Sequence, residues 1–336
     1  MSDQRKDGIA WTDKTWNPLR GCSKVSTGCK NCYAETMAAR FAGPGQPYEG
    51  TIGRGRWNGR IRLVPEKLSE PLHWKRTRRI FVNSMSDLFH EGVPFEYIAA
   101  VFGVMAAAPQ HVFQVLTKRP ERAVEFFAWA QGNNHSHPET ICLHYSRAYT
   151  AAPANGVYRW PLPNVWLGVS VEDQATADAR IPDLLMCPAA VRFVSYEPAL
   201  AGVDFGVYLR DHACDEWPKE ISKGPESCVA HPMPALDWIV IGGESGPHAR
   251  PFDVAWAYDT VRQCRAAGVA CFVKQMGARP RVAEASRLAA LWAAMPGGRV
   301  DDCGGIHLRD RTGADPAEWP EDLRVREWPA AKEGEQ

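Results

Sequence analysis

The sequence lacks any apolar run long enough to span a membrane, and its first residues, MSDQRKDGIAWTD, are polar rather than signal-like. It also lacks net charge, since 39 Lys and Arg balance 39 Asp and Glu. A neutral chain has no general attraction to nucleic acid, so only a local basic patch would bind phosphate. These absences predict a cytoplasmic protein with no membrane partner.

The chain has ten cysteines. A reducing cytoplasm disfavours a disulfide framework, so metal ligation or catalysis becomes the more informative interpretation for any clustered cysteines. Most of the ten are nevertheless expected to be small core residues.

Short β-branched and aromatic runs alternate with helical patterns over much of the 336 residues. This alternation is typical of βαβ units with a parallel sheet. Together with a first strand before Cys22, it predicts an α/β fold: a complete or partial (β/α) TIM-type barrel of six to seven parallel strands with loop insertions. The expected strands are 79–87, 111–119, 164–173, 191–198, 237–246 and 270–275, and the expected helices are 94–108, 120–130, 173–185 and 254–268.

We expect one barrel domain over residues 1–278. Segments 131–163 and 207–236 are long, contain Pro and Gly and lack periodicity, so they are interpreted as insertions. Residues 279–336 are expected to form a C-terminal extension that packs on the barrel.

Polar side chains recur where the expected strands end, which in barrels is the rim that carries active sites. The alternative is that strand ends simply become polar on reaching solvent. The residues concerned are Ser84, Asp87, Thr117, Lys118, Ser170, Glu172, Ser195, Glu197, Glu244, Ser245, Lys274 and Gln275.

Three cysteines, Cys22, Cys29 and Cys32, lie within eleven positions in the spacing C-x6-C-x2-C, and no fourth Cys or His follows before His73. A structural zinc site closes with four ligands, and iron–sulfur clusters usually have four cysteines. Three ligands therefore leave one coordination position open. The alternative is that all three cysteines are inert apolar groups.

The segment GCSKVSTGCKNCYAE resembles the cluster loop of the radical SAM superfamily, and in particular its spore-photoproduct-lyase-like branch. The usual spacing there is C-x3-C-x2-C, three residues shorter between the first two cysteines. NSMSDLF, LTKRP, VSVED and YEPAL match that branch in type and order. The wider pattern, with WTDKTWNPLRGC, VNSMSDLF, IGGESGPHARP and FVKQMG, resembles a phage- and prophage-associated family named for its three-cysteine motif, over residues 9–278.

This resemblance implies that Cys22, Cys29 and Cys32 hold a [4Fe-4S] cluster and that S-adenosyl-L-methionine (SAM) occupies its fourth iron. Reductive cleavage would give a 5′-deoxyadenosyl radical that abstracts hydrogen from a substrate in the barrel. It further implies an electron donor such as flavodoxin or ferredoxin and a companion protein encoded nearby. The expected substrate is a nucleic acid or nucleotide, as in phage DNA modification or repair, and the Arg/Trp stretch 54–62 is the best local basic candidate.

The resemblance also implies roles for single residues. Lys118, Ser84 and Ser170 would contact the methionyl part of SAM, and Tyr33 would pack near the adenine. Asp87 or Glu197 would accept ribose hydroxyls. Cys264, close to the expected rim, would donate a hydrogen atom, with ordinary packing as the alternative.

Two other functions compete with this one. A zinc-stabilised nucleic-acid-binding protein without redox chemistry would use a structural zinc at His212, Cys214, Cys228 and His231, two close pairs in the second insertion. A barrel hydrolase would use Glu197, Glu244 and Lys274 in acid–base roles.

Overall fold

The computed structural model describes residues 9–132, 138–150, 159–211, 234–283, 286–295 and 298–330. The chain divides into two compact units. Unit 1 comprises 1–169 with 186–192, and unit 2 comprises 170–185 with 193–336. The predicted division at residue 278 stays a prediction.

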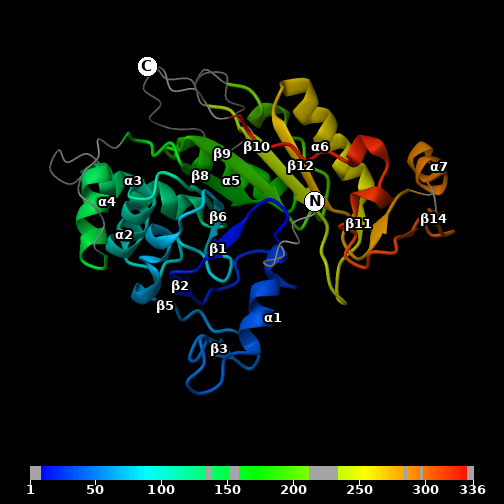
Figure 1. The fold of residues 1–336 in the computed structure, drawn as a ribbon. Coiled ribbons are helices and arrows are strands. Elements are labelled where there is room, and N and C mark those ends of the chain that lie inside the picture. The colour runs from blue at the N-terminus through cyan, green and yellow to red at the C-terminus, as the bar shows by residue number, and fades with distance from the viewer. Residues whose placement is uncertain are drawn as a thin grey trace. The chain divides into compact units, whose positions relative to one another are not determined.

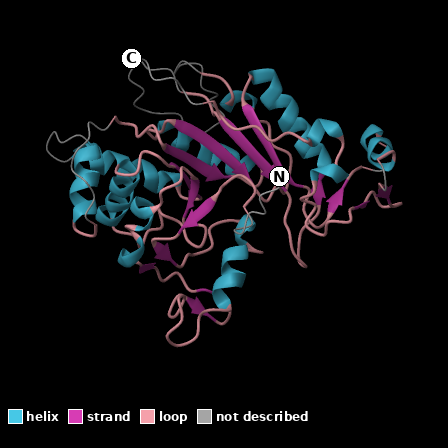
Figure 2. Cartoon of the chain, viewed as in Figure 1, coloured by secondary structure: helices cyan, strands magenta, loops and turns pink. Residues whose placement is uncertain are grey.

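Seven strands form the main sheet, and each strand pairs with its neighbours in parallel (Figures 1 and 2). The order is β1-β6-β7-β8-β9-β10-β12, so β1 and β12 are the edge strands. This confirms the α/β fold class, in its partial rather than complete barrel form. The strands are β1 (Lys14–Trp16), β6 (Arg79–Val82), β7 (Val112–Thr117), β8 (Val165–Ser170), β9 (Val191–Tyr196), β10 (Trp238–Gly242) and β12 (Ala270–Gln275).

Four helices connect successive strands as the periodicity predicted: α2 (Phe95–Ala106), α3 (Pro120–Gly132), α5 (Gln174–Met186) and α6 (Val254–Ala267). Strands β8 and β10 are buried throughout, as parallel strands covered on both faces must be. Helix α6 begins where the Asp253 side chain accepts from Ala255 N, and it ends at Gly268, whose φ of 68° a glycine adopts without steric cost.

Residues 19–63 form a small substructure of unit 1 that we call the cysteine lobe. Strands β2 (Leu19–Arg20) and β5 (Arg62–Leu63) pair antiparallel where the chain enters and leaves it. Between them lie a 3-10 helix at Thr27–Cys29, helix α1 (Tyr33–Ala39), and the paired strands β3 (Ile52–Gly53) and β4 (Arg56–Trp57). Figure 1 shows α1 and β3 together in the blue part of the ribbon.

The interval 131–163 contains a helix, α4 (Pro138–Arg147), that packs against α2. Its apolar residues Ile141 and Leu143 are buried, so the lack of periodicity was a poor guide to this stretch. The second expected insertion lies largely outside the described residues.

Within the described ranges, no helix combines the length and apolarity needed to cross a membrane.

The C-terminal part of unit 2 adds short elements. Val273 N of β12 donates to Val325 O at 2.8 Å, which holds the last described segment against the sheet edge. The short elements of this part are β11 (Phe252–Asp253), β13 (Pro280–Arg281), α7 (Arg287–Ala293), β14 (Arg299–Val300), β15 (Ile306–His307) and 3-10 helices at 316–318 and 321–323. Further 3-10 helices lie at 65–67 and 70–73 in unit 1 and at 206–208 in unit 2.

Candidate functional site

The three clustered cysteines all lie in the cysteine lobe, and all are free and partly exposed. Cys22 directly follows the bridge between Gly21 and Ser86, Cys29 ends the 3-10 helix, and Cys32 caps α1. The Cys32 sulfur accepts a hydrogen bond from Glu35 N at 3.4 Å.

Among the residues that the structure describes, no three His, Cys, Asp or Glu side chains converge as a site for one metal ion. A cubane cluster makes a different demand, because each cysteine binds a different iron and the sulfurs need not meet at one point. Three unoxidised thiols in one short loop match that donor set. Three free cysteines in one loop therefore supply the type of donor that such a cluster takes.

Burial, and next the nearby charge of Asp87, raise the pKa of Cys22 to about 12, and the thiols of Cys32 and Cys29 contribute in the same direction. A cation bound between them would reverse this effect, because metal binding and loss of thiol protons are linked.

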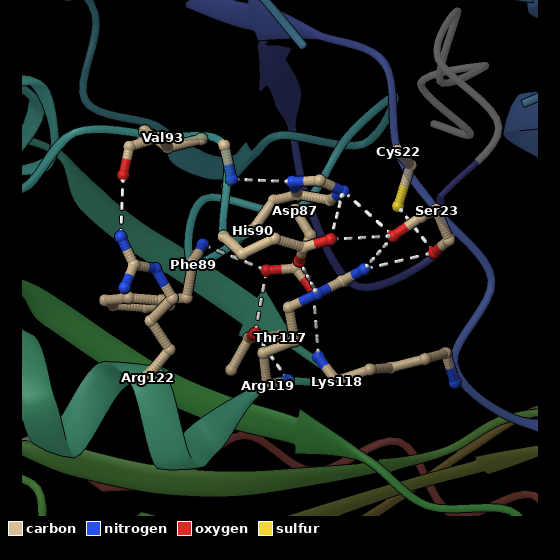
Figure 3. Close-up of polar contacts among 12 residues, drawn as sticks. Cys22, Ser23, Asp87, Phe89, His90, Val93, Thr117, Lys118, Arg119 and Arg122 are labelled. Atoms are coloured by element: carbon tan, nitrogen blue, oxygen red, sulfur yellow. Dashed lines mark hydrogen bonds and ion pairs between the residues drawn. The ribbon is translucent and has the colours of Figure 1, made fainter. Parts of the chain in front are cut away.

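Arg119, two residues after the end of β7, fixes the start of the cysteine lobe to the sheet (Figure 3). Its NH2 donates to Ser23 O at 3.1 Å and to Ser23 Oγ at 2.7 Å, so the residue next to Cys22 is held at two points. The same guanidinium donates through NH1 to Asp87 at 2.9 Å and through Nε to Glu91 at 3.2 Å. Such a planar fork suits several oxygen acceptors at once.

Asp87 is the buried centre of this network. Its Oδ1 accepts from Phe89 N and Thr117 Oγ1, and its Oδ2 accepts from Lys118 N and Arg119 NH1. An ionised carboxylate has about four acceptor positions, and the protein supplies four donors here. The predicted ribose contact of Asp87 stays a prediction, while its observed contacts position the strand ends.

His90 is buried and neutral. Its Nδ1 accepts from Gly92 N at 3.0 Å, so the proton lies on Nε2, which faces Ser23 Oγ at 2.9 Å. Desolvation and the nearby Arg119 charge lower the pKa of His90. For Glu91, burial would raise the pKa, but a backbone hydrogen bond and the Arg119 charge lower it overall.

At Gly21 the backbone and its surroundings leave room only for glycine. Its φ is 97°, and a Cβ atom there would lie 2.1 Å from Arg60 O. This close approach seats the Cys22 backbone against the strand that returns from the lobe.

Asn83 stands at the carboxyl end of β6 with φ at 61°, a strained value for a residue other than glycine. Its side chain is 3% exposed, and in the described structure neither its Oδ1 nor its Nδ2 has a hydrogen-bond partner. A buried amide without partners is costly unless a ligand or water completes it. Next to it, Ser84 Oγ donates to Asn17 Oδ1 at 3.2 Å.

Lys118 and Tyr33, the other unit 1 residues predicted to bind SAM, are placed differently from each other. Lys118 lies in the Asp87 network by its backbone, and Figure 3 shows its side chain extending away from that carboxylate. Tyr33 is 71% exposed at the first turn of α1. Both roles stay predictions.

The remaining predicted residues lie in unit 2. Ser170 is buried, and its carbonyl oxygen accepts from Arg180 NH1 at 2.7 Å. Glu197 pairs with Lys274 at 2.9 Å, and a Cβ on Gly242 would lie 2.7 Å from the Glu197 carboxylate. Their cofactor contacts stay predictions.

Cys264 is fully buried in α6. The pKa of Cys271 in β12 is raised, first by a hydrogen bond with Cys264, then by burial and by the charge of an ionised Cys264. Cys264 thus lies between a helix and the sheet, which favours the packing alternative over hydrogen-atom donation. Glu244 forms a partly buried ion pair with Arg250. The expected zinc ligands His212, Cys214, Cys228 and His231 lie outside the described residues.

Sequence reasoning missed Ser23, Asn83, His90, Glu91 and Arg119. For Arg119, the signal was its place after LTK at a strand end, although an ordinary solvated helix start explains that pattern equally well. Asn83 offered the matching signal as the first polar residue after IFV. Ser23, His90 and Glu91 carry no local signal, because their roles depend on contacts across 28 or more positions.

The fold and site define an α/β protein with a partial (β/α) barrel sheet and a three-cysteine lobe. The chain belongs to the family described as Protein of unknown function (DUF5131), whose model matches residues 6–302. Neither the curated proteins nor the solved structures contain a match to it.

Proposed function

We propose that this chain is a radical SAM enzyme whose cysteine lobe binds a [4Fe-4S] cluster through Cys22, Cys29 and Cys32. The observation that carries the proposal is the lobe itself: three free, partly exposed thiols in one loop, tied to the strand ends through Ser23. When bound, such a cluster supplies the electron that cleaves SAM to methionine and a 5′-deoxyadenosyl radical.

The chain's own residues would orient the cofactor. Arg119 holds the peptide after Cys22, and Gly21 fixes the peptide before it. The Lys118 ammonium would pair with the methionyl carboxylate, as a compact point charge does. The Asn83 amide and the Ser84 hydroxyl, neighbours at the end of β6, would accept from and donate to the polar atoms of the same ligand.

The substrate we propose is a nucleic acid or nucleotide, supported by the resemblance of the strand-end motifs to the lyase-like branch and by the arginines of residues 54–62. An electron donor such as flavodoxin or ferredoxin belongs to this proposal, because the cleavage is reductive.

Anaerobic iron and sulfide analysis tests the proposal. Reconstituted protein should hold about four iron and four sulfide per chain, and SAM should perturb the electron paramagnetic resonance signal of the reduced protein. Cys29→Ala should lose most of the iron. Cys303→Ala, which removes an exposed cysteine elsewhere in the chain, is the matched control and should retain it.

Colourless protein with stoichiometric zinc and no iron would instead favour the zinc-stabilised binding protein. The hydrolase alternative is favoured by the Glu197–Lys274 pair, with Glu197 only 13% exposed at a strand end. Hydrolytic activity that survives Cys29→Ala and disappears in Glu197→Gln would establish it.

A further inference from the structure

The cysteine lobe differs sharply from the rest of the chain in charge. Residues 20–62 contain eight Lys and Arg but two Asp and Glu, an excess of six positive charges in a chain whose total is zero. The remainder therefore carries the compensating negative excess. A local field of this kind concentrates anionic ligands at one place and repels them elsewhere.

Most of these cations have no ionic partner within the described chain. Lys24 pairs with Glu35 at 2.7 Å, and Arg20 donates to Pro47 O while lying over the Tyr48 ring. The other six are exposed, and in the described parts of the chain none forms an ion pair: Lys30, Arg40, Arg54, Arg56, Arg60 and Arg62.

Both acids of the lobe form contacts within it, and the excess of six positive charges already includes their two negative charges. Glu35 is buried, and it accepts from Trp57 N at 3.0 Å in addition to its pair with Lys24. Glu49 accepts from Gly45 N at 2.8 Å. The outward-facing ionic groups of the lobe are therefore almost entirely cationic.

Exposed rings accompany the cations. Phe41 is 46% exposed two residues beyond the end of α1, and Tyr33 at the start of that helix is 71% exposed. Isolated exposed aromatics carry little meaning alone. Beside arginines they supply flat surfaces on which bases stack, and unpaired bases are available in single strands.

The arginine segment is a defined part of the lobe. Strands β3 and β4 pair through Ile52 with Trp57 and Gly53 with Arg56, and Asn58 N donates to Thr51 O. The Trp57 ring packs against Tyr48, 6.3 Å between centroids. Arg54 and Arg56 thus project from a folded turn, and Arg60 and Arg62 continue into β5.

From these observations we propose that the cysteine lobe is a binding surface for single-stranded nucleic acid. The guanidinium groups of residues 54–62 contact phosphates, and exposed rings such as Phe41 stack on bases. Arginine suits this role because its planar fork binds two phosphate oxygens at once. The proposal that the lobe binds single strands depends only on the observations above. The further step, that the bound strand is the enzyme's substrate, rests on the proposed function.

Fluorescence anisotropy with labelled 20-nucleotide DNA and RNA strands, on the full chain, tests this. The variant with Arg54, Arg56, Arg60 and Arg62 all changed to Gln should bind about a hundredfold more weakly at low salt, because each exposed ion pair contributes up to about fivefold. The slope of log K against log salt should shrink by about 0.7 for each phosphate that the variant no longer neutralises. Phe41→Ala should weaken binding without changing that slope.

The control changes Arg279, Arg281, Arg299 and Arg311 to Gln. These are four exposed arginines of unit 2 that have no ion pair in the described structure, so the net charge changes equally. Strand binding should remain within about twofold of wild type. If both variants bound the strand equally weakly, the loss of affinity would follow from the change in net charge alone, and the proposal would be overturned.

Further arms separate the other partners. Duplex DNA, heparin and vesicles rich in anionic lipid should all bind more weakly than the single strand, and equal or tighter binding of any of them would overturn the proposal. Tighter binding of DNA or of RNA identifies the natural strand. Iron content is measured on every variant, so a protein that binds strands but holds no iron contradicts only the proposed redox function.

Discussion

Asn83 combines two unfavourable features, a positive φ and a buried amide with no partner in the described structure. Strain of this kind is retained where the surroundings impose it, and it clusters at ligand sites. Its neighbour Ser84 carries a predicted SAM contact, so the strain falls next to the proposed cofactor site.

We predict that Asn83→Gly raises the free energy of unfolding by about 1 kcal/mol, since glycine adopts the backbone conformation freely and leaves no amide unpaired. The same change should weaken SAM binding by about tenfold, measured by equilibrium dialysis on reconstituted protein. A purely structural residue would change stability only, so unchanged SAM affinity would contradict the role given to Asn83.

His90 and His111 supply a prediction about acid stability. Desolvation lowers the pKa of both histidines in the folded protein, and at His90 the Arg119 charge lowers it further. Unfolded chains then bind protons that the folded chain excludes. Stability is fully present above the ordinary histidine pKa of about 6.5 and declines as the pH falls below it.

The free energy of unfolding, followed by urea denaturation between pH 7.5 and 5, should therefore decrease, by at most about 1.4 kcal/mol per pH unit for each proton taken up. His90→Gln keeps a donor and an acceptor at the site but cannot titrate, so its pH dependence should be shallower, with His111 supplying the rest. An unchanged slope in His90→Gln would show that this histidine is not the titrating group.

At the scale of elements, the cysteine loop is held by a contact from outside its own lobe. Arg119 follows β7, Asp87 follows β6, and Ser23 lies inside the loop, so one guanidinium joins three segments that are distant in sequence. Because the arginine is 5% exposed, these hydrogen bonds do not compete with water.

Arg119→Lys keeps the charge but cannot reach all three acceptors, so we predict a loss of about 1–3 kcal/mol in the free energy of unfolding. Alkylation of Cys22, followed by peptide mass spectrometry in native buffer, should become faster because the loop opens. Arg262→Lys, in an exposed pair with Asp259, is the control and should change neither quantity. Unchanged Cys22 reactivity in Arg119→Lys would exclude an anchoring role.

Strands β6 to β12 of the main sheet and helices α2, α3, α5 and α6 begin and end within a few residues of the segments expected from periodicity. These elements are long and bury one face or both, so their apolar pattern is strong. Strands β2 to β5 were not predicted, because strands of two residues have no periodicity. Helix α4 was missed because its burial against α2 is a tertiary effect.

At the scale of the whole molecule, the fold class followed from the alternation of strands and helices, and the seven-stranded parallel sheet confirms it. The candidate site was only partly accessible to the same reasoning. Strand-end residues such as Ser84, Asp87 and Lys118 were found because topology gathers them at one rim. Which of them are already occupied by protein donors, as Asp87 is, depends on side-chain geometry that the sequence does not encode locally.

The contacts that Arg119 makes with Asp87 and Ser23 also limit which substitutions this chain can accept. Replacing Asp87 alone would leave the buried Arg119 with only the exposed Glu91 as counter-charge, and replacing Arg119 alone would leave a buried anion. Substitutions at Asp87 and Arg119 are therefore expected to occur together in related sequences, accompanied by changes at Ser23. A change at only one of the two charged positions should be rare.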